Sequence, residues 1–401
     1  MAGRLLSISV VGVVLLCGCG NAKPDSIGGL SGPSPPGVSP DAGGTSNPCD
    51  GLRPGPPGQP VTVKVPLNGR FSALSPLADG QGNVVTGTAG ASNIYAADGG
   101  FLGRASFLAF QPNGFGLTVP LASGFAGAIL AVNGPALVRV TPGGGVQDIA
   151  ALNDFVALTT ADPRGGLVLF TPTALTAYDD EMRSRFMLPL QLPGVQPGQL
   201  GVDVAGNTLI LFGANAFVYD LNGIWVDAAG NPGMAFPVAQ QLRIDENVFS
   251  LAPDVQGGLF LWHQVCPGGG SHCTSEWERY AALSSSPEPA PDWLSSRPAP
   301  NLRLIHGQSG YALTGAPLPA CAFEVLTATG MSCGFADFAP QLASSDASAP
   351  HFTANATGGR PPCHAALDIG RDGTVLSLTD EGCNAQGECP VSYDWFPAYF
   401  R

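Results

Sequence analysis

Three stretches of the chain share one pattern, and this pattern decides the fold: DPRGGLVLF at 162–170, DVAGNTLILF at 203–212 and DVQGGLFLW at 254–262. Each begins with Asp, passes through small or polar residues to a Gly, and ends in an unbroken apolar run. Gly permits the positive φ of a tight turn, and the Asp carboxylate hydrogen-bonds to turn amides. A short apolar run after such a turn is typical of a buried strand. The pattern therefore predicts tight turns followed by buried β-strands.

The turn signal recurs along the chain in degenerate copies. One Gly from each copy is found at Gly82, Gly114, Gly165, Gly206, Gly257, Gly310 and Gly373. The mean step of about 48 residues is the size of a four-stranded propeller blade. An alternating run at Val61–Val65 and an apolar run at Thr374–Leu378 fit the same scheme, and only Asp292–Arg297 could hold a helical turn. We therefore expect an all-β chain.

The repeat resembles bacterial β-propellers of the broad NHL, kelch and WD-repeat kind. It lacks the Trp-Asp dipeptide of WD repeats, and its Gly doublets precede the apolar strand, whereas the kelch doublet follows one. The resemblance implies a β-propeller over residues 61–401, with seven blades or between six and eight. Tandem β-sandwiches are the alternative, and a β-helix would need a shorter and stricter period.

Composition excludes several other classes. The 401 residues include 55 Gly and 38 Pro, which are too many helix breakers for a helical bundle or coiled coil. Charged residues make up 12%, and the formal net charge is −13. Lys23 and Lys64 are the only lysines. Nucleic-acid binding requires a basic surface, so we expect no nucleic-acid partner.

Residues 1–18 have the features of an export signal. Arg4 supplies a short positive start, and Leu5–Leu16 is an apolar run. The run is too short to span a bilayer, which needs ~20 residues, but it suits a signal peptide. Residues 19–60 follow as a Pro- and Gly-rich segment with few large apolar residues. Such a segment buries too little surface to offset its ordering entropy, so we expect a tether.

The end of the export signal resembles the lipobox of bacterial lipoproteins. Leu16 stands at −3, Gly18 at −1 and Cys19 at +1, while Cys17 at −2 departs from the usual small or aliphatic residue. The resemblance implies that Cys19 becomes the mature N-terminus and carries acyl chains such as palmitate, which would anchor the protein in the cell envelope. Gly20 at +2 favours the outer membrane over the inner one. An ordinary secretory signal is the alternative.

Eight cysteines remain after processing, and an oxidising compartment makes disulfide bonds the default interpretation. Eight cysteines allow 105 pairings. Closeness in sequence favours Cys266 with Cys273, Cys321 with Cys333 and Cys383 with Cys389, which leaves Cys49 with Cys363. The last pair would join the start of the body to its last repeat.

Two metal sites can be considered, and neither is expected. His263, Cys266, His272 and Cys273 could supply four zinc ligands, but the adjacent pair would be strained in one tetrahedral site. The stretch Asp368–Gly373 resembles the opening of a calcium loop, but it lacks a carboxylate at the third position and a Glu at the twelfth, which is Thr379, so a plain turn is favoured. We expect no cofactor.

Catalytic motifs are missing from the chain. It contains no G-x-S-x-G, no H-E-x-x-H and no Walker A loop. Their absence favours a lipid-anchored binding or scaffold module for protein or glycan partners over an enzyme. The alternative is a propeller hydrolase of sugars or lactones, with its residues at the central channel.

One loop is the candidate contact surface. A disulfide between its two ends would clamp the loop Cys266–Cys273 into a rigid protrusion. The candidate contact residues flank it or lie in it: Trp262, His263, His272, Trp277 and Tyr280. Trp and Tyr often anchor interfaces. The alternative is that these aromatic side chains pack inside a blade.

Overall fold

The structure is a computed structural model. It describes residues 48–49, 52, 61–65, 74–78, 84–88, 91–96, 98–106, 120–123, 129–133, 136–141, 145–152, 156, 158–179, 181–190, 192, 196–213, 218–243, 250–265, 274–297, 301–305, 310–314, 322–337, 364–369, 375–380 and 391–396.

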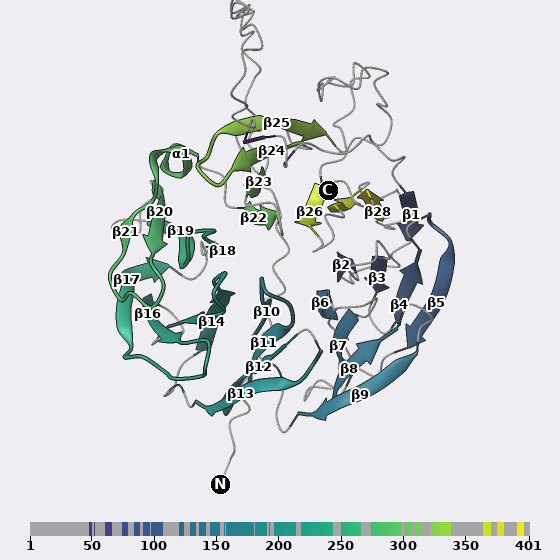
Figure 1. Cartoon of the computed structure of the whole chain (residues 1–401), viewed down its shortest axis with the longest axis horizontal. Coiled ribbons are helices and arrows are strands. Elements are labelled where there is room, and N and C mark those ends of the chain that lie inside the picture. The colour runs from purple at the N-terminus through teal and green to yellow at the C-terminus, as the bar shows by residue number, and fades with distance from the viewer. Residues whose placement is uncertain are drawn as a thin grey trace, which may run out of the picture.

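The described strands form seven four-stranded antiparallel sheets, which we call blades 1 to 7 (Figure 1). Blades 1 to 3 consist of β2 (Leu74–Ala78), β3 (Val84–Thr88), β4 (Ala91–Tyr95) and β5 (Phe101–Ser106); β6 (Pro120–Ser123), β7 (Ile129–Asn133), β8 (Ala136–Val140) and β9 (Val146–Ala151); and β10 (Leu158–Ala161), β11 (Leu167–Phe170), β12 (Ala174–Tyr178) and β13 (Ser184–Pro189). Blades 4 and 5 consist of β14 (Gln196–Val202), β15 (Thr208–Gly213), β16 (Val218–Val226) and β17 (Phe236–Arg243); and β18 (Ser250–Pro253), β19 (Leu259–Val265), β20 (Thr274–Tyr280) and β21 (Glu288–Pro289). Blades 6 and 7 consist of β22 (Asn301–Ile305), β23 (Gly310–Thr314), β24 (Ala322–Thr327) and β25 (Ser332–Asp337); and β26 (His364–Ile369), β27 (Val375–Asp380), β28 (Val391–Phe396) and β1 (Val61–Val65).

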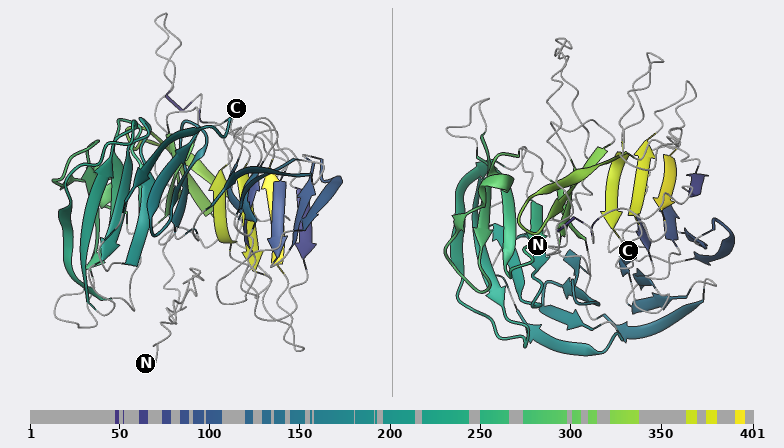
Figure 2. Two further views of the ribbon diagram at one scale, coloured as in Figure 1. Left: turned by 90° about the horizontal axis from the view of Figure 1, so that it is seen from below. Right: turned by 45° about the horizontal axis from the view of Figure 1, so that its top comes forward.

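The blades stand side by side around a common axis, as both views of Figure 2 show. The first strand of each blade lies innermost, and these inner strands contact one another in cyclic order, β26 meeting both β22 and β2. β1 pairs with β28, from Val61 opposite Trp395 to Val65 opposite Val391. The first strand of the chain thus supplies the outer strand of blade 7, and backbone hydrogen bonds close the ring. This arrangement is a β-propeller, and it confirms the expected fold class.

The core lies between neighbouring blades. In β15, Leu209 and Leu211 pack with residues of blade 5, whereas Ile210 and Phe212 pack with residues of blade 3. The second strand of a blade is therefore buried on both faces, which explains its unbroken apolar sequence. The same holds for β11, whose four residues are all buried.

The repeated Asp-to-Gly motif forms the hairpin between the first two strands of a blade. In blade 4 the Gly206 amide donates to the Asp203 carbonyl at 2.9 Å, and the Asp203 amide donates to the Asn207 carbonyl at 2.9 Å. Gly206 has a φ of 88°, the left-handed conformation that closes a three-residue hairpin loop. Blades 3 and 5 repeat these bonds. The motif is therefore a turn signal, as predicted.

Two other local predictions can be compared with the described strands. A short helix, α1 (Asp292–Ser295), lies within the predicted helical turn. The copy assigned to Gly114 was wrong, because Gly114 lies between β5 and β6, whereas the first hairpin of blade 2 spans 124–128. In the described part of the chain, no helix has the length and apolarity needed to cross a membrane.

The chain is fixed to the ring before β1 begins. Cys49 forms a disulfide bond with Cys333, with 5.4 Å between the Cα atoms. Leu52 is 2% exposed, and a Cβ added to Gly310 would lie 2.7 Å from its side chain. The predicted tether over residues 19–60 is thus attached to blade 6 at these two residues.

The expected pairings Cys49–Cys363 and Cys321–Cys333 were therefore wrong. Pairing of β1 with β28 already joins the two ends of the ring. The chain that precedes β1 can therefore be held by the neighbouring blade. The other candidates lie outside the described residues: Cys266, Cys273, Cys321, Cys363, Cys383 and Cys389.

Candidate binding site at the hairpin end of the ring

Both hairpins of an antiparallel four-stranded blade, which join its first two and last two strands, lie at the same end of the ring. We call this the hairpin end. Three turn aspartates lie buried there, Asp162 at 4%, Asp203 at 0% and Asp254 at 3% exposure. One oxygen of each carboxylate accepts a hydrogen bond from the backbone amide two residues further on, at 2.8 to 2.9 Å. The sequence thus fixes each carboxylate inside its own turn.

In blade 3, two arginines neutralise the buried Asp162. Arg164 donates to both carboxylate oxygens, at 3.2 and 3.0 Å, and Arg185 also contacts Oδ2. The Arg164 side chain lies over the next turn, because a Cβ added to Gly206 would be 1.7 Å from its guanidinium. Glycine is therefore required at position 206, because the backbone has a positive φ there and because the Arg164 guanidinium approaches so closely.

In blade 4, the Asp203 carboxylate bonds to the following blade. Its Oδ2 accepts hydrogen bonds from the Asn207 side chain at 2.9 Å and from the Gly258 amide of blade 5 at 3.3 Å. Asn207 in turn accepts a hydrogen bond from the Ala228 amide at 3.1 Å. The carboxylate therefore joins two hairpins of different blades.

In blade 5, Asp254 connects to blade 6. The Tyr311 hydroxyl donates to Asp254 Oδ1 at 3.3 Å and accepts from the Val255 amide at 2.9 Å. Arg279 donates to Asp254 Oδ2 at 2.6 Å and to Glu288 at 2.6 Å. The bond to Asp254 raises the pKa of the Arg279 guanidinium, and burial raises the pKa of the Tyr311 hydroxyl.

Contacts and hydrogen bonds therefore link the hairpins from blade 3 to blade 6. Each buried carboxylate in the series is held by turn amides, by arginine or by both. Carboxylates that are held in this way stiffen the surface, and none of these carboxylates is left free for proton transfer. The three described carboxylates therefore add rigidity to the hairpin end.

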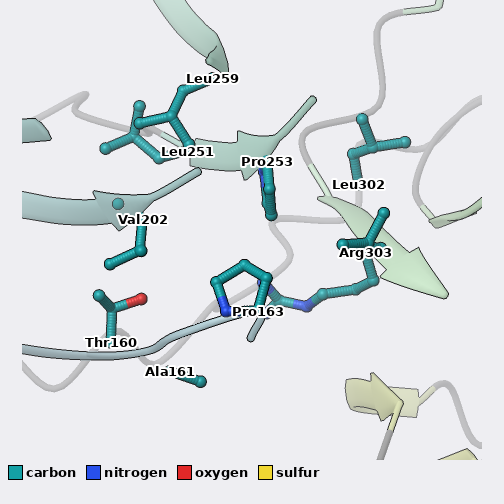
Figure 3. A pocket seen from close by; sticks show the side chains of 11 residues that line it. Thr160, Ala161, Pro163, Val202, Leu251, Pro253, Leu259, Leu302 and Arg303 are labelled. Carbon is teal, nitrogen blue, oxygen red and sulfur yellow. The ribbon is translucent and has the colours of Figure 1, made fainter. Parts of the chain in front are cut away.

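A cavity of about 140 Å³ lies at this end of the central channel (Figure 3). Blades 3 to 6 all contribute to its wall, which exposes polar and apolar atoms about equally. Its residues without a polar side chain are Ala161, Pro163, Gly201, Val202, Leu251, Pro253, Leu259, Leu302 and Leu304. The polar side chains of the lining are the Thr160 hydroxyl and the Arg303 guanidinium. Arg303 extends from β22 toward Pro163 in the figure. Arg303 is exposed, so water reaches its guanidinium.

Exposed apolar side chains surround the cavity at a greater radius. Within the described residues, each large exposed apolar side chain lies on a second hairpin or an outer strand of blades 1 to 6: Phe101, Leu102, Val146, Met187, Met234, Leu283 and Met331. We call this set the apolar rim. Met234 is 89% exposed. Leu283 has a φ of 61°, which is uncommon for a residue other than Gly and marks local strain.

The predicted contact residues do not form a surface. Trp262, Trp277, Tyr280 and His263 are between 0% and 6% exposed. Trp262 and Trp277 lie opposite each other on β19 and β20 and pack against blade 6. Tyr280 packs against blade 4. The alternative of blade packing is therefore correct for these four side chains.

The remaining predicted sites fall on residues that the structure does not describe. His272, the loop Cys266–Cys273, Gly370–Gly373 and the lipid-attachment residue Cys19 lie outside the described ranges. Within those ranges, no three His, Cys, Asp or Glu side chains gather as a metal site would require.

Sequence reasoning missed Arg303. A signal was present, since β22 reads NLRLI and places one charge between two leucines. A single Arg in an apolar strand marks a position that cannot be packed into a core without a partner.

No family model and no curated protein matches the chain. Among solved structures it is similar to streptogramin B lyase, at 11% identity and a TM-score of 0.43, over 83% of this chain and 97% of that one. It is also similar to the Pan2 WD40 domain of Neurospora crassa, at 10% identity and a TM-score of 0.47, over 80% and 89% of the two chains. A gluconolactonase of Xanthomonas campestris matches at 12% identity and a TM-score of 0.35, over 67% and 82%. These neighbours include enzymes as well as a repeat domain.

Proposed function

We propose that the protein is a lipid-anchored binding module of the cell envelope and that its hairpin end docks a protein partner. The apolar rim is the observation that carries this proposal. Met and Phe are enriched at protein interfaces, and large apolar side chains exposed to water gain free energy when a partner covers them. The bonds between neighbouring hairpins hold the rim rigid, which lowers the entropy lost on binding.

The lining of the cavity, to which blades 3 to 6 contribute, supports binding over hydrolysis. Its polar side chains are a threonine and an arginine, without a carboxylate or histidine that could transfer a proton. The apolar rim favours a protein over a glycan, because sugar hydroxyls have no matching partners on methionine, leucine and valine side chains.

The point of attachment favours a partner close to the membrane. Cys49 is bonded to Cys333, whose disulfide sulfur lies 3.9 Å from the carbonyl oxygen of Met331 in the rim. With acyl chains on Cys19, the 30 residues from Cys19 to Cys49 would form a coil of roughly 30 Å root-mean-square length. The hairpin end would then lie within reach of a protein in the same membrane.

Site-directed photo-crosslinking in the envelope tests the docking. A photoreactive phenylalanine analogue at Met234 should give one discrete adduct, whereas the same analogue at Thr173 should not. Thr173 is exposed but lies in the link between β11 and β12, at the opposite end of the strands. Met187→Asp in the Met234 background should remove the adduct. Equal adducts from both positions, or none from either, would refute docking at the rim.

The anchor has its own test. Cys19→Ala should release the exported protein from the membrane fraction, because acyl chains contribute ~0.8 kcal/mol per buried methylene. Unchanged membrane fractionation of this variant would contradict lipid attachment at Cys19.

A further inference from the structure

Two residues other than glycine have a positive φ in the described part of the chain, Met182 at 66° and Leu283 at 61°. This conformation brings the Cβ of a side chain too close to the following carbonyl oxygen, so the backbone is strained there. In the second hairpins of blades 1, 4 and 6, glycine adopts it, at Gly99, Gly230 and Gly330. The turn alone therefore does not require a side chain at positions 182 and 283.

Packing accounts for the side chain at Met182 but not for the one at Leu283. Met182 is partly buried and packs against the core cluster that contains Leu137, Leu169 and Tyr178. Leu283 is 50% exposed and belongs to none of the core clusters in the described residues. Burial within the chain therefore does not offset the strain at Leu283. A partner that covers this side chain would offset it.

One buried tryptophan fixes the two hairpins that carry Leu283 and Met234. Trp225 of β16 is 3% exposed, and its indole Nε1 donates to the Ser284 carbonyl of blade 5 at 2.7 Å. Its own carbonyl accepts from the Gly233 amide of blade 4 at 2.7 Å. Blades 4 and 5 are neighbours in the ring (Figure 1). The residues next to Leu283 and Met234 are thus both bonded to Trp225, so the two exposed side chains share one rigid support. We call Leu283 and Met234 the contact pair.

The exposure of the contact pair indicates the shape of the surface that can cover it. Met234 is 89% exposed and Leu283 is 50% exposed, so both side chains project from their hairpins. A groove covers a projecting side chain on several sides and removes more of its area from water than a flat surface does. Side chains that are buried in this way supply most of the binding energy of protein interfaces.

The charges of the second hairpins favour cations at the edge of that groove. Arg183 is an exposed cation of these hairpins, and its guanidinium is already paired with Asp179 and Glu181, at 2.9 and 2.8 Å. Asp98 and Asp227 accept hydrogen bonds from groups of their own turns, and among the described residues no cation pairs with them. The formal net charge of −13 also attracts basic surfaces.

We propose that the contact pair inserts into an apolar groove of a protein partner and that lysine or arginine side chains border this groove. The proposal rests on the proposed docking at the hairpin end, and it names the residues that dominate the contact and the chemistry of the partner. The strained turn at Leu283 presents a leucine side chain where glycine would present none.

Photo-crosslinking from Met234 in the envelope tests the contact. Leu283→Asn should lower the yield of the Met234 adduct at least about tenfold, because loss of a dominant interface side chain weakens binding by this factor or more. Leu283→Met keeps an apolar side chain and should retain most of the adduct. Ser285→Asn is the matched control, because Ser285 is an exposed polar residue of the same hairpin. Salt added before irradiation should lower the yield, because it screens the attraction between carboxylates and cations.

Stability separates a contact role of Leu283 from a packing role. Asn adopts a positive φ more readily than leucine does, so Leu283→Asn should raise the ratio of folded to unfolded protein in urea about fivefold. Met182→Asn relieves the same strain but removes a packed side chain, so it should lower this ratio.

Several results would overturn the proposal. A Met234 adduct that survives Leu283→Asn or does not fall with salt would do so, as would an adduct with lipid or with a second copy of the chain. A loss of stability in Leu283→Asn like that in Met182→Asn would assign Leu283 to packing. No adduct from the wild type would refute docking at the rim itself and this proposal with it, so the two failures can be distinguished.

Discussion

Replacing Asp254 by Ala should destabilise the propeller strongly, because this carboxylate is bonded to two blades. Its Oδ2 accepts from Arg279 at 2.6 Å, and its Oδ1 accepts from the Gln256 amide at 2.9 Å and from the Tyr311 hydroxyl at 3.3 Å. The variant removes both acceptor oxygens and with them all three hydrogen bonds. Arg279 would keep Glu288 as a partner.

The magnitude follows from burial. Removing one partner of a buried ion pair costs ~3–5 kcal/mol. The Asp254 side chain is 5% exposed and that of Arg279 is 21% exposed, so water partly compensates the guanidinium. We therefore expect a loss of about 3 kcal/mol in the free energy of unfolding, at the lower end of that range. Asp254→Asn should cost nearly as much, because the amide nitrogen would face the Arg279 donor.

Asp227 provides the matched control. It begins the same kind of turn in blade 4 and accepts from the Ala229 amide, the Asn231 amide and the Asn231 side chain, at 2.8 to 2.9 Å. These bonds stay within its own turn, and Asp227 is only partly buried, whereas Asp254 is buried. Asp227→Ala should therefore lower stability much less than Asp254→Ala.

Urea unfolding followed by tryptophan fluorescence measures both variants. A double-mutant cycle with Tyr311→Phe isolates the bond between the blades, and a coupling of ~0.5–1.5 kcal/mol between Asp254 and Tyr311 is expected. Equal losses for Asp254→Ala and Asp227→Ala, with no coupling to Tyr311, would refute the role of the carboxylate between blades.

Three further predictions concern the same end of the ring. Gly258→Ala should lower the urea midpoint far more than Gly257→Ala, although both glycines have a positive φ. A Cβ at Gly258 would lie 2.1 Å from a backbone carbonyl oxygen, whereas a Cβ at Gly257 would meet nothing within 4 Å. Equal urea midpoints of the two variants would contradict this. A proteolytic digest of the unreduced protein should yield a peptide pair that is joined by the Cys49–Cys333 disulfide. Reduction of this disulfide should lower the free energy of unfolding by ~2–5 kcal/mol. Any other partner for Cys49 would contradict the pairing. Because burial raises the pKa of Tyr311, its contribution to stability is present below its ordinary pKa of ~10 and is lost as pH rises above it. Urea midpoints of the wild type should therefore fall more steeply above pH 10 than those of Tyr311→Phe, and parallel curves would contradict this.

Local features of the sequence predicted the centre of each blade well. The second strand of a blade can be recognised in the sequence, because burial on both faces requires an unbroken apolar run such as that of β15. The turn before them is encoded by residues only four positions apart, Asp203 and Asn207 among them. Inner strands carry a weaker signal. β18 reads SLAP and β10 reads LTTA, because one edge lines the channel and only part of each strand is buried.

Contacts between blades could not be predicted in this way. Trp262 and Trp277 flank a long loop, which is typical of a protruding surface, but the next blade covers them with Leu302 and Tyr311. Only the arrangement of the blades around the ring shows that blade 6 covers these two side chains. The pairing of Cys49 failed for the same reason, since its partner is 284 residues away and closeness in sequence carries no information about it.

The Asp and Gly residues that recur in the turns carry little information about function. Each turn Asp and Gly is used by the geometry of the hairpin, so a functional side chain must be sought where one blade departs from the others. Thr159, Leu200 and Leu251 each lie three residues before the turn Asp of blades 3 to 5, and Arg303 lies three residues before His306, where the corresponding turn of blade 6 begins. At this position of the inner strand, three blades carry an uncharged residue and one carries a guanidinium. Turn geometry does not require that charge, and no carboxylate of the described chain pairs with it. Arg303 is exposed, so water solvates its guanidinium, and the inner strand of blade 6 can carry a charge where those of blades 3 to 5 carry none.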